Sequence, residues 1–331
     1  FKDDKDWEVR KAVVNKLSDK KLIFETFKGD EDPCVREAVV QKLSDKKLIY
    51  DTFKDDEDPY VREAVVKKLS DEQLIYSFKD DVAWEVRKEV INKLSDEQLI
   101  YSFKDDKDWK IREAVIKKLS DEQLIYSFKD DKDSWVRKAV VNKLSDEKLI
   151  YSFKDDKKWF VREAVVKKLS DEKLIFDTFK DDEHSRVRLA VIEKLSDGKL
   201  IYSFKNDEDW EVREAVVNKL SDKKLIYSFK NDEDWEVRLA VVKKLSDEKL
   251  ISYFKDDEDS GIRRAVIERL SNEKLIFNTF KDDKFWDVRE AVVNKLSDEK
   301  LISYFKNDED LDVRKAVVNK LSDEQLIFDT F

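Results

Sequence analysis

The most reactive side chains of this sequence, one histidine and one cysteine, are too few to form a catalytic or metal site by themselves. Cys34 and His184 are the only residues of their types among 331. A structural zinc site takes four Cys or His ligands, and a Cys–His nucleophile needs its base within hydrogen-bonding distance. The three glycines form no phosphate-binding loop. We therefore predict that the chain is not an enzyme and has no catalytic, cofactor-binding or metal residues.

Acidic runs are the other candidate for chemistry, because carboxylates bind Ca²⁺. The run DDED at residues 55–58 is an example. Such runs lack the glycine and the distal glutamate of an EF-hand loop. Helix capping explains them better than calcium binding does.

The tryptophans carry the clearest signal of a binding surface, because all eight lie in equivalent four-residue windows. Each window precedes a repeated Val-Arg or Ile-Arg pair. In chain order the windows read KDWE, EDPC, EDPY, VAWE, KDWK, KDSW, KKWF, EHSR, EDWE, EDWE, EDSG, KFWD and EDLD. A packed core does not exchange Trp, Pro, Ser and Leu, since their volumes differ too much. We therefore expect the windows to be exposed and aligned along one edge.

Large aromatic residues on an exposed edge are typical of protein-binding surfaces. The sequence predicts a protein or peptide partner contacted by the large window residues, which are Trp7, Tyr60, Trp84, Trp109, Trp135, Trp159, Phe160, Arg186, Trp210, Trp235 and Trp286. The alternative is that each indole lies flat over the preceding copy as a structural contact. Copies with Pro or Ser in the same place keep every other feature, which favours the binding hypothesis.

The windows belong to a repeat that fills the whole chain as a single array, residues 1–331. One arginine marks its register, from Arg10 to Arg314, in thirteen copies of 25 or 26 residues. The copies begin near Phe1, Phe27, Phe53, Phe78, Phe103, Phe128, Phe153, Phe179, Phe204, Phe229, Phe254, Phe280 and Phe305.

Each copy predicts two helices. In the first copy, apolar residues at helical spacing predict a long helix over residues 7–17, with Asp6 as N-cap; Pro occupies the first helical position of the second and third copies. Ser18 is expected to cap a second, shorter segment that carries Leu22, Ile23 and Phe27 and is α-helical or 3-10 helical. One copy cannot bury its own apolar face, so copies must stack. The predicted fold class is an all-α, superhelical α-solenoid of thirteen two-helix repeats.

The recurring string D-x-D-x-x-V-R-x-A-V-V-x-x-L, as in residues 4–17 and 207–220, resembles the second helix of HEAT-like repeats. The short period is similar to that of the leucine-rich repeat variant, in which α and 3-10 helices alternate in a right-handed superhelix. The resemblance covers the entire chain and implies a scaffold that binds other molecules. Some HEAT-like proteins cleave alkylated bases from DNA and others attach bilin pigments, but no residues here match such catalytic roles.

Residues that are nearly the same at one equivalent position in all copies, here called a column, are predicted to have structural roles. The arginines and an aspartate column that begins with Asp4 are expected to form an Asp–Arg ladder between copies; the alternative is arginines aimed at phosphates. The columns of Lys2 and Lys16 are expected on solvated faces. Glu89 replaces the alanine of the other twelve copies, so either this copy has a special pocket or the column is half-buried.

Bulk properties restrict the partner. The net charge of −10 disfavours nucleic acid, which stays a second alternative. The chain shows no signal peptide and no membrane-spanning run, so we expect a soluble protein of unknown compartment. Neither end of the array looks like a capping copy. The chain is therefore expected either to be part of a longer array or, as the first alternative function, to self-assemble through its ends or its Trp edge.

Overall fold

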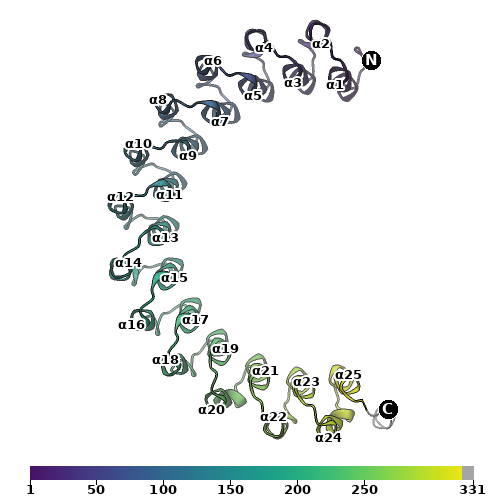
Figure 1. Ribbon diagram of the computed structural model, residues 1–331, viewed down its shortest axis with the longest axis vertical. Helices are drawn as coiled ribbons and strands as arrows, with labels where there is room; N and C mark the ends of the chain where they lie inside the picture. Colours follow the sequence, from purple (N-terminus) through teal and green to yellow (C-terminus); the bar gives the residue numbers. More distant parts are fainter. Residues whose placement is uncertain (323–331) are drawn as a thin grey trace. The chain divides into compact units, whose positions relative to one another are not determined.

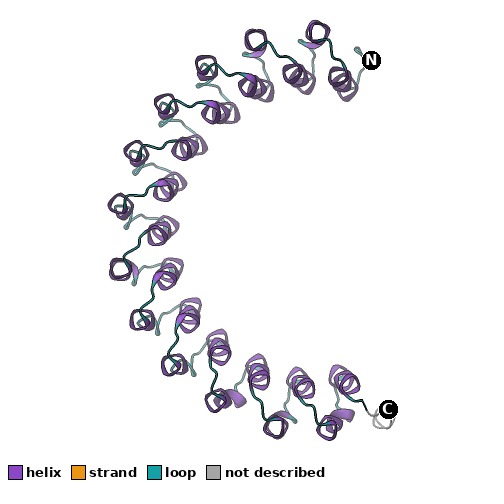
Figure 2. Cartoon of the chain, in the orientation of Figure 1, coloured by secondary structure: helices purple, strands orange, loops and turns teal. Residues whose placement is uncertain are grey.

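The computed structural model describes residues 1–322, in which the first twelve copies each form a pair of helices and the thirteenth is described through its long helix. Contacts divide the chain into two compact units, Phe1–Leu169 and Ser170–Phe331. Within each unit, the long helices follow one another in one row and the short helices in a second row (Figure 1). The described chain contains helices and loops but no strand (Figure 2). The prediction of an all-α solenoid of long and short helices is confirmed. That the solenoid is superhelical, and that residues 1–331 form a single repeat array, stay predictions.

The first unit contains seven long helices of ten residues, all of the same length. They are α1 (Trp7–Lys16), α3 (Pro33–Lys42), α5 (Pro59–Lys68), α7 (Trp84–Lys93), α9 (Trp109–Lys118), α11 (Ser134–Lys143) and α13 (Trp159–Lys168). The short helices between them are α2 (Lys20–Phe27), α4 (Lys46–Phe53), α6 (Glu72–Tyr76), α8 (Glu97–Tyr101), α10 (Glu122–Tyr126) and α12 (Glu147–Tyr151).

The second unit repeats this order through residue 322. Its long helices are α15 (Ser185–Lys194), α17 (Trp210–Lys219), α19 (Trp235–Lys244), α21 (Ser260–Arg269), α23 (Trp286–Lys295) and α25 (Leu311–Lys320). Its short elements are α14 (Glu172–Phe179), α16 (Gly198–Tyr202), α18 (Lys223–Tyr227), α20 (Glu248–Ile251) with 3-10 helix η1 (Ser252–Asp256), α22 (Glu273–Phe280), and α24 (Glu299–Ile302) with η2 (Ser303–Asn307). The short helix predicted for the thirteenth copy lies outside the described residues.

The long helices begin where the sequence predicts. The carboxylate of Asp6 accepts a hydrogen bond from the backbone amide of Glu8 at 2.8 Å, and Pro33 and Pro59 occupy the first helical position. A helix of ten residues is marginal by itself in water. Each long helix therefore depends on packing against the long helices of neighbouring copies, as α1 packs on α3 and α3 on α5.

The prediction that Ser18 caps the short helix is wrong. Asp19, the next residue, is the N-cap, and its carboxylate accepts hydrogen bonds from the amides of Lys21 and Leu22 at 2.9 and 3.1 Å. The positive end of the helix dipole also stabilises a carboxylate at this position. The Ser column instead contacts the preceding copy: the amide of Ser120 donates to Glu97 at 2.7 Å.

The single-residue difference between long and short copies decides the form of the second helix. Copies with the extra residue make an eight-residue α-helix, as in α2 and α4. Copies without it make five residues followed by a turn, as in α6. Where the order Tyr-Ser becomes Ser-Tyr, at residues 252–253 and 303–304, the helix passes into a 3-10 turn. Both expected forms of this segment therefore occur in the same chain.

The core lies between the two rows of helices. The columns of Val13 and Leu17 are buried in the second copy as Val39 and Leu43, and half-buried in the first. Ile23 and Phe27 of the short helix are also buried. The apolar residues at helical spacing are thus the ones that form the core. The opposite face of each long helix is accessible for binding.

Candidate binding surface

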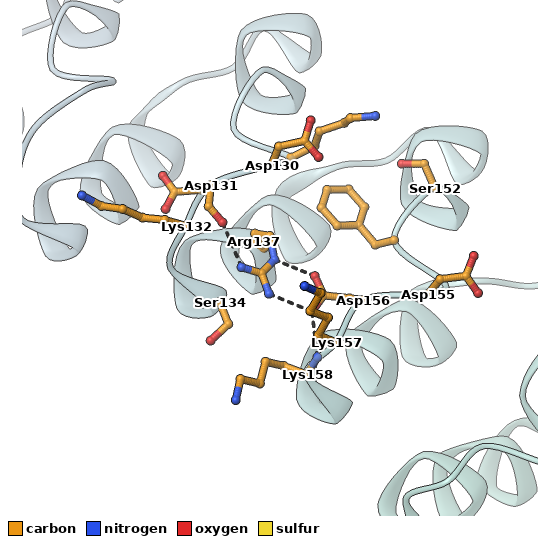
Figure 3. Close-up of a pocket in the computed structure, with 12 residues that line it drawn as sticks. Asp130, Asp131, Lys132, Ser134, Arg137, Ser152, Asp155, Asp156, Lys157 and Lys158 are labelled. Carbon is orange, nitrogen blue, oxygen red and sulfur yellow. Dashed lines mark hydrogen bonds and ion pairs between the residues drawn. The ribbon is translucent and has the colours of Figure 1, made fainter.

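The repeats are joined by the predicted Asp–Arg ladder, which is confirmed. In the first unit, Arg137 Nε and Nη2 donate to the two carboxylate oxygens of Asp156 in the next copy at 2.6 and 2.9 Å. Arg137 Nη1 donates to the backbone carbonyl of Asp131 in its own copy at 2.8 Å. Figure 3 shows the guanidinium between these two acceptors. The arginines are therefore engaged within the solenoid, which opposes the alternative that they bind phosphates.

Further copies repeat the same fork-to-carboxylate geometry in both units. The pairs are Arg10–Asp30, Arg36–Asp56, Arg62–Asp81, Arg87–Asp106, Arg112–Asp131, Arg188–Asp207, Arg213–Asp232, Arg238–Asp257, Arg263–Asp283 and Arg289–Asp308.

The pairing with arginine lowers the pKa of Asp156, one of the ladder aspartates. Burial by itself raises the pKa of Asp156. The hydrogen bonds from Arg137 and from the amide of Lys158, with the charges of Arg137 and Arg162, lower the pKa, and the net pKa lies below that of an ordinary aspartate. The same hydrogen bond raises the pKa of Arg137. Both shifts favour the charged forms, so Arg137 and Asp156 form an ion pair at neutral pH.

Two further connections join neighbouring copies. The lysine at the end of a long helix, expected on a solvated face, donates in many copies to a carbonyl at the end of the preceding long helix, as Lys118 Nζ does to the Asn92 carbonyl at 2.8 Å. The expectation for the Lys16 column is therefore only partly correct. Lys118 is exposed to solvent as expected, but its ammonium group also satisfies a carbonyl that a helix end leaves open. On the short-helix row, the hydroxyls of Tyr101 and Ser127 form a hydrogen bond at 3.0 Å between copies.

The lysine column that begins with Lys2 also has a specific contact in many copies. Lys28 lies over the ring of Phe24 at 4.6 Å and Lys230 over that of Tyr227 at 4.7 Å. These ammonium groups combine solvent exposure with a cation–π contact to the short helix. The expectation of a purely solvated face is thus only partly correct.

The variable windows lie at the starts of the long helices, where the sequence places them, but their exposure is uneven. Tyr60 is 64% exposed and Trp135 50%; Trp235, Trp286 and Arg186 are exposed as well. The other predicted residues are half-buried: Trp7, Trp84, Trp109, Trp159, Phe160 and Trp210. The expectation of a fully exposed edge is therefore wrong for these six.

The window aromatics contact residues of neighbouring copies, some in the following copy and some in the preceding one. Lys110 Nζ lies 4.2 Å from the ring centroid of Trp84, one copy earlier. Trp135 stacks on Phe160 of the next copy, with ring centroids 4.7 Å apart, and Phe160 meets Trp159 edge to face at 5.8 Å. Aromatic pairs of this kind stabilise by about 0.5–1.5 kcal/mol beyond burial. The residues thus connect copies and still present ring surface.

The structure brings several window residues to grooves between consecutive long helices. Trp84 and Trp109 line a groove of about 440 Å³ between α7 and α9, and Trp135 lines one of about 290 Å³ between α9 and α11. In the second unit, Arg186 and Trp210 line a groove of about 620 Å³ between α15 and α17. The other predicted residues lie in the first turn of their own helices and line none of these three grooves: Trp7, Tyr60, Trp159, Phe160, Trp235 and Trp286.

The grooves include residues that the sequence analysis did not select. Lys88 and Asn92 follow Trp84 by four and eight residues and line the same groove, with Ala114 of the next helix. Residues at this spacing share one face of a helix, so the periodicity could have identified them. The Trp-bearing edge is therefore one border of a wider surface, the solvent-facing side of the long helices.

Glu89 takes part in this surface without forming a special site. Its side chain is half-buried and accepts a hydrogen bond from Asn92 Nδ2 at 3.2 Å. Its column ranges from buried Ala38 to exposed Ala12. This supports the interpretation that the column is only partly enclosed.

The described residues contain no group of three or more His, Cys, Asp or Glu arranged to hold a metal ion. Cys34 and His184 lie at the starts of different helices, in different units. None of the helices within residues 1–322 combines the length and apolar character needed to cross a membrane.

Comparisons with known proteins agree with this architecture. The structure is similar to a solved structure described as a leucine-rich repeat variant with a novel repetitive structural motif, with a TM-score of 0.57 and 25% identity over 65% of this chain and 87% of that one. Weaker likenesses are to importin beta (TM-score 0.36, 9% identity, 92% of this chain and 56% of that one) and the S. pombe condensin Cnd3–Cnd2 subcomplex (0.34, 14%, 98% and 66%). No protein-family model and no curated protein matches the sequence. The chain is a repeat α-solenoid whose fold is similar to that of the leucine-rich repeat variant.

Proposed function

We propose that this solenoid is a non-enzymatic scaffold that binds a protein or peptide across the exposed side of its long helices, with the variable windows as the specificity-determining border. The observation that carries the proposal is the coincidence of the variable windows with the grooves. Trp84, Trp109 and Trp135 each line a groove, whereas the invariant residues of the same copies, such as Arg137 and Asp156, join one copy to the next.

The chemistry of the grooves fits a polypeptide partner. Half-buried aromatic rings offer large contact area with little loss of side-chain entropy. The alanines between them, such as Ala114 and Ala139, let a ligand approach the helix backbone. Asn and Lys side chains at the far end of the helices add hydrogen-bond donors, as Asn142 and Lys143 do. This mixture of aromatic, small and polar residues is typical of protein interfaces.

The test is selection of peptides from a random displayed library on the immobilised full chain. We expect enriched peptides whose binding weakens at least about tenfold, the effect of losing a binding hot spot, in a Trp84→Ser/Trp109→Ser variant. Ser is the natural residue at this position in three other copies, at Ser134, Ser185 and Ser260, so folding is preserved. The matched control replaces exposed Lys47 and Lys148 of the short helices by Ser.

Two results contradict the proposal. One is the absence of enriched peptides, and the other is peptides that bind the Trp variant and the control equally. Unchanged circular dichroism and urea midpoints of both variants confirm that lost binding reflects the groove and not unfolding.

A further inference from the structure

The long-helix surface of copies 4–7, in the first unit, has a distinct charge as well as aromatic rings. The windows of copies 5–7 contain five lysines, Lys107, Lys110, Lys132, Lys157 and Lys158. Their two acids, Asp108 and Asp133, are N-caps whose carboxylates already accept backbone amides. In copies 9 and 10 of the second unit, both windows read EDWE and contain no lysine.

Three lysines of this surface have no carboxylate partner. Lys88, Lys110 and Lys138 form no ion pair within residues 1–322, and each lies over aromatic rings instead. Lys110 is 4.2 Å and Lys88 5.6 Å from the ring of Trp84. Lys138 lies 5.5 Å from the ring of Trp135 and 5.7 Å from that of Phe160. Lys117, by contrast, pairs with Glu113 of its own helix at 2.7 Å.

Two helices of this surface also lack a capping side chain. The N-cap residues of α7 and α13 are Ala83 and Lys158, and neither accepts a hydrogen bond from the first turn with its side chain. The other two, α9 and α11, are capped by Asp108 and Asp133. A carboxylate of a ligand could therefore bind the ammonium groups of these lysines. At the starts of α7 and α13 it could also bind backbone N–H groups that no capping side chain occupies.

The grooves of this surface are continuous. Glu113 and Lys117 of α9 line both the groove against α7 and the groove against α11. Beyond α11, the stack of Trp135 on Phe160 connects to α13. Four consecutive long helices thus share one aromatic and basic surface.

We infer that this surface of α7, α9, α11 and α13 binds an extended acidic peptide segment, with carboxylates on Lys88, Lys110 and Lys138 and apolar side chains against the rings of Trp84, Trp109 and Trp135. The inference rests on the proposed function and names its partner class. Packed helices lie roughly 10 Å apart and an extended chain rises about 3.3 Å per residue. A carboxylate at every third residue therefore matches one long helix after another, and about nine residues span the surface.

A peptide fits this surface better than nucleic acid does. A phosphate backbone carries a charge at every step and requires a continuous row of cations. Here Glu85, Glu89 and Glu113 lie among the lysines, and a phosphate chain would meet them as like charges. A peptide can place neutral residues opposite these three carboxylates.

The test measures fluorescence anisotropy of labelled synthetic peptides with the full chain. The probe has about twelve residues, enough to exceed the surface, with Glu at every third position and Leu after each Glu. The reference peptide has Lys in place of Glu, and a labelled oligothymidylate represents nucleic acid. We expect the Glu peptide to bind, with affinity that falls as salt rises, and the Lys peptide to bind at least about tenfold more weakly.

The decisive variant is Lys88→Glu/Lys110→Glu/Lys138→Glu. Other copies carry Glu at the equivalent positions, namely Glu113 and Glu163 for Lys88 and Lys138, and Glu211 for Lys110, so the scaffold accepts these substitutions. We expect it to lose at least about tenfold in affinity for the Glu peptide. The control, Lys21→Glu/Lys47→Glu/Lys148→Glu on the exposed short helices, makes the same change in net charge and is expected to bind as before.

Four outcomes overturn the inference. The first two are equal binding of the Glu and Lys peptides, and an equal loss of affinity for the Glu peptide in the two triple variants. The third is tighter binding of oligothymidylate than of the Glu peptide. The fourth is a dimer, seen in sedimentation, that only the groove variant abolishes, which would assign the surface to a second copy of this chain. If the Glu peptide fails while library-selected peptides still depend on Trp84 and Trp109, the proposed function stands and the acidic partner alone is rejected. If both fail, the proposed function falls as well.

Discussion

Neighbouring residues of the same type have opposite roles in this repeat. Asp155 and Asp156 are adjacent aspartates in the seventh copy, and Figure 3 shows that only Asp156 meets the guanidinium of Arg137. The side chain of Asp156 is 6% exposed, and that of Asp155 is 82% exposed and pairs with Lys154 at the surface. A buried pair that loses one partner leaves a charge without compensation, whereas an exposed pair contributes little.

Replacing these two aspartates separates the two roles. We expect Asp156→Ala to lower the free energy of unfolding by about 3 kcal/mol, because the side chain of Arg137, which is only 15% exposed, then lacks its carboxylate partner. Asp155→Ala is the matched control and is expected to change it by less than about 1 kcal/mol. Urea unfolding followed by circular dichroism measures both. Equal effects of the two substitutions would show that the ladder does not stabilise the solenoid.

Individual helices differ in how well their ends are satisfied. The start of α9 has Asp108, whose carboxylate accepts the amide of Lys110 at 2.9 Å. The start of α7 has Ala83, which has no side-chain acceptor. The backbone conformation is the same extended one at both caps, so an aspartate fits at the position of Ala83. The fourth copy therefore lacks an interaction that most other copies possess.

Restoring the missing cap tests this difference. We expect Ala83→Asp to raise the free energy of unfolding by about 1 kcal/mol, and Asp108→Ala to lower it by a similar amount. Hydrogen exchange of the first turn of α7 locates the effect. Val82→Asp adds the same charge one residue earlier, at an 80% exposed side chain, and serves as control. If the Ala83→Asp variant has no higher free energy of unfolding than the Val82→Asp variant, the capping explanation is contradicted.

Local patterns predict the elements well and predict side-chain environments less well. Asp6 and Pro33 mark helix starts because capping and the missing proline amide act within a few residues. The Ser18 and Asp19 pair was assigned wrongly, since both residues cap helices and only the inter-copy contact of the Ser column distinguishes them. Trp84 is half-buried and contacts Lys110, which lies 26 residues later in the chain. A comparison of the window sequences does not reveal this contact, because it joins two different copies.

The grooves show the same limit at the scale of the site. Sequence comparison between copies finds the variable border, because variation at one position excludes a tightly packed core. The floor of the groove, with Ala114 and Ala139, belongs to a nearly constant column and gives no such signal. The partner's charge follows from which lysines lack a carboxylate partner within residues 1–322, as Lys110 does, and which have one, as Lys117 does; this distinction requires the structure.

Across the whole molecule, the solenoid depends on one interface repeated from copy to copy within each unit. The pKa of Asp30, Asp156 and Asp308 lies below the ordinary value: burial opposes this, but arginine hydrogen bonds, backbone amides and arginine charges outweigh it. An interface that recurs along the array makes the array sensitive to any condition that weakens it. Acid is such a condition, because it protonates the carboxylates of the ladder.

The direction of the acid effect follows from these lowered pKa values. An unfolded aspartate titrates at about pH 4. Asp30, Asp156 and Asp308 have a lower pKa in the folded chain and bind protons less readily there, so protons favour the unfolded chain. The stabilisation is complete above about pH 4 and is lost as the pH falls through the lower pKa values of the folded state. We expect a constant urea midpoint from about pH 7 to about pH 5 and a steep decline below about pH 4.

The variant Asp156→Asn assigns this decline to the ladder. It is expected to be less stable at neutral pH and to lose less on acidification, because one group that gains a proton on unfolding is gone. Asp155→Asn is the control and should follow the unsubstituted chain. Since repeat arrays can unfold in parts, hydrogen exchange of α11 and α13 measures the effect at the altered interface. A decline of the same steepness in Asp156→Asn would show that groups outside the ladder control the acid sensitivity of the solenoid.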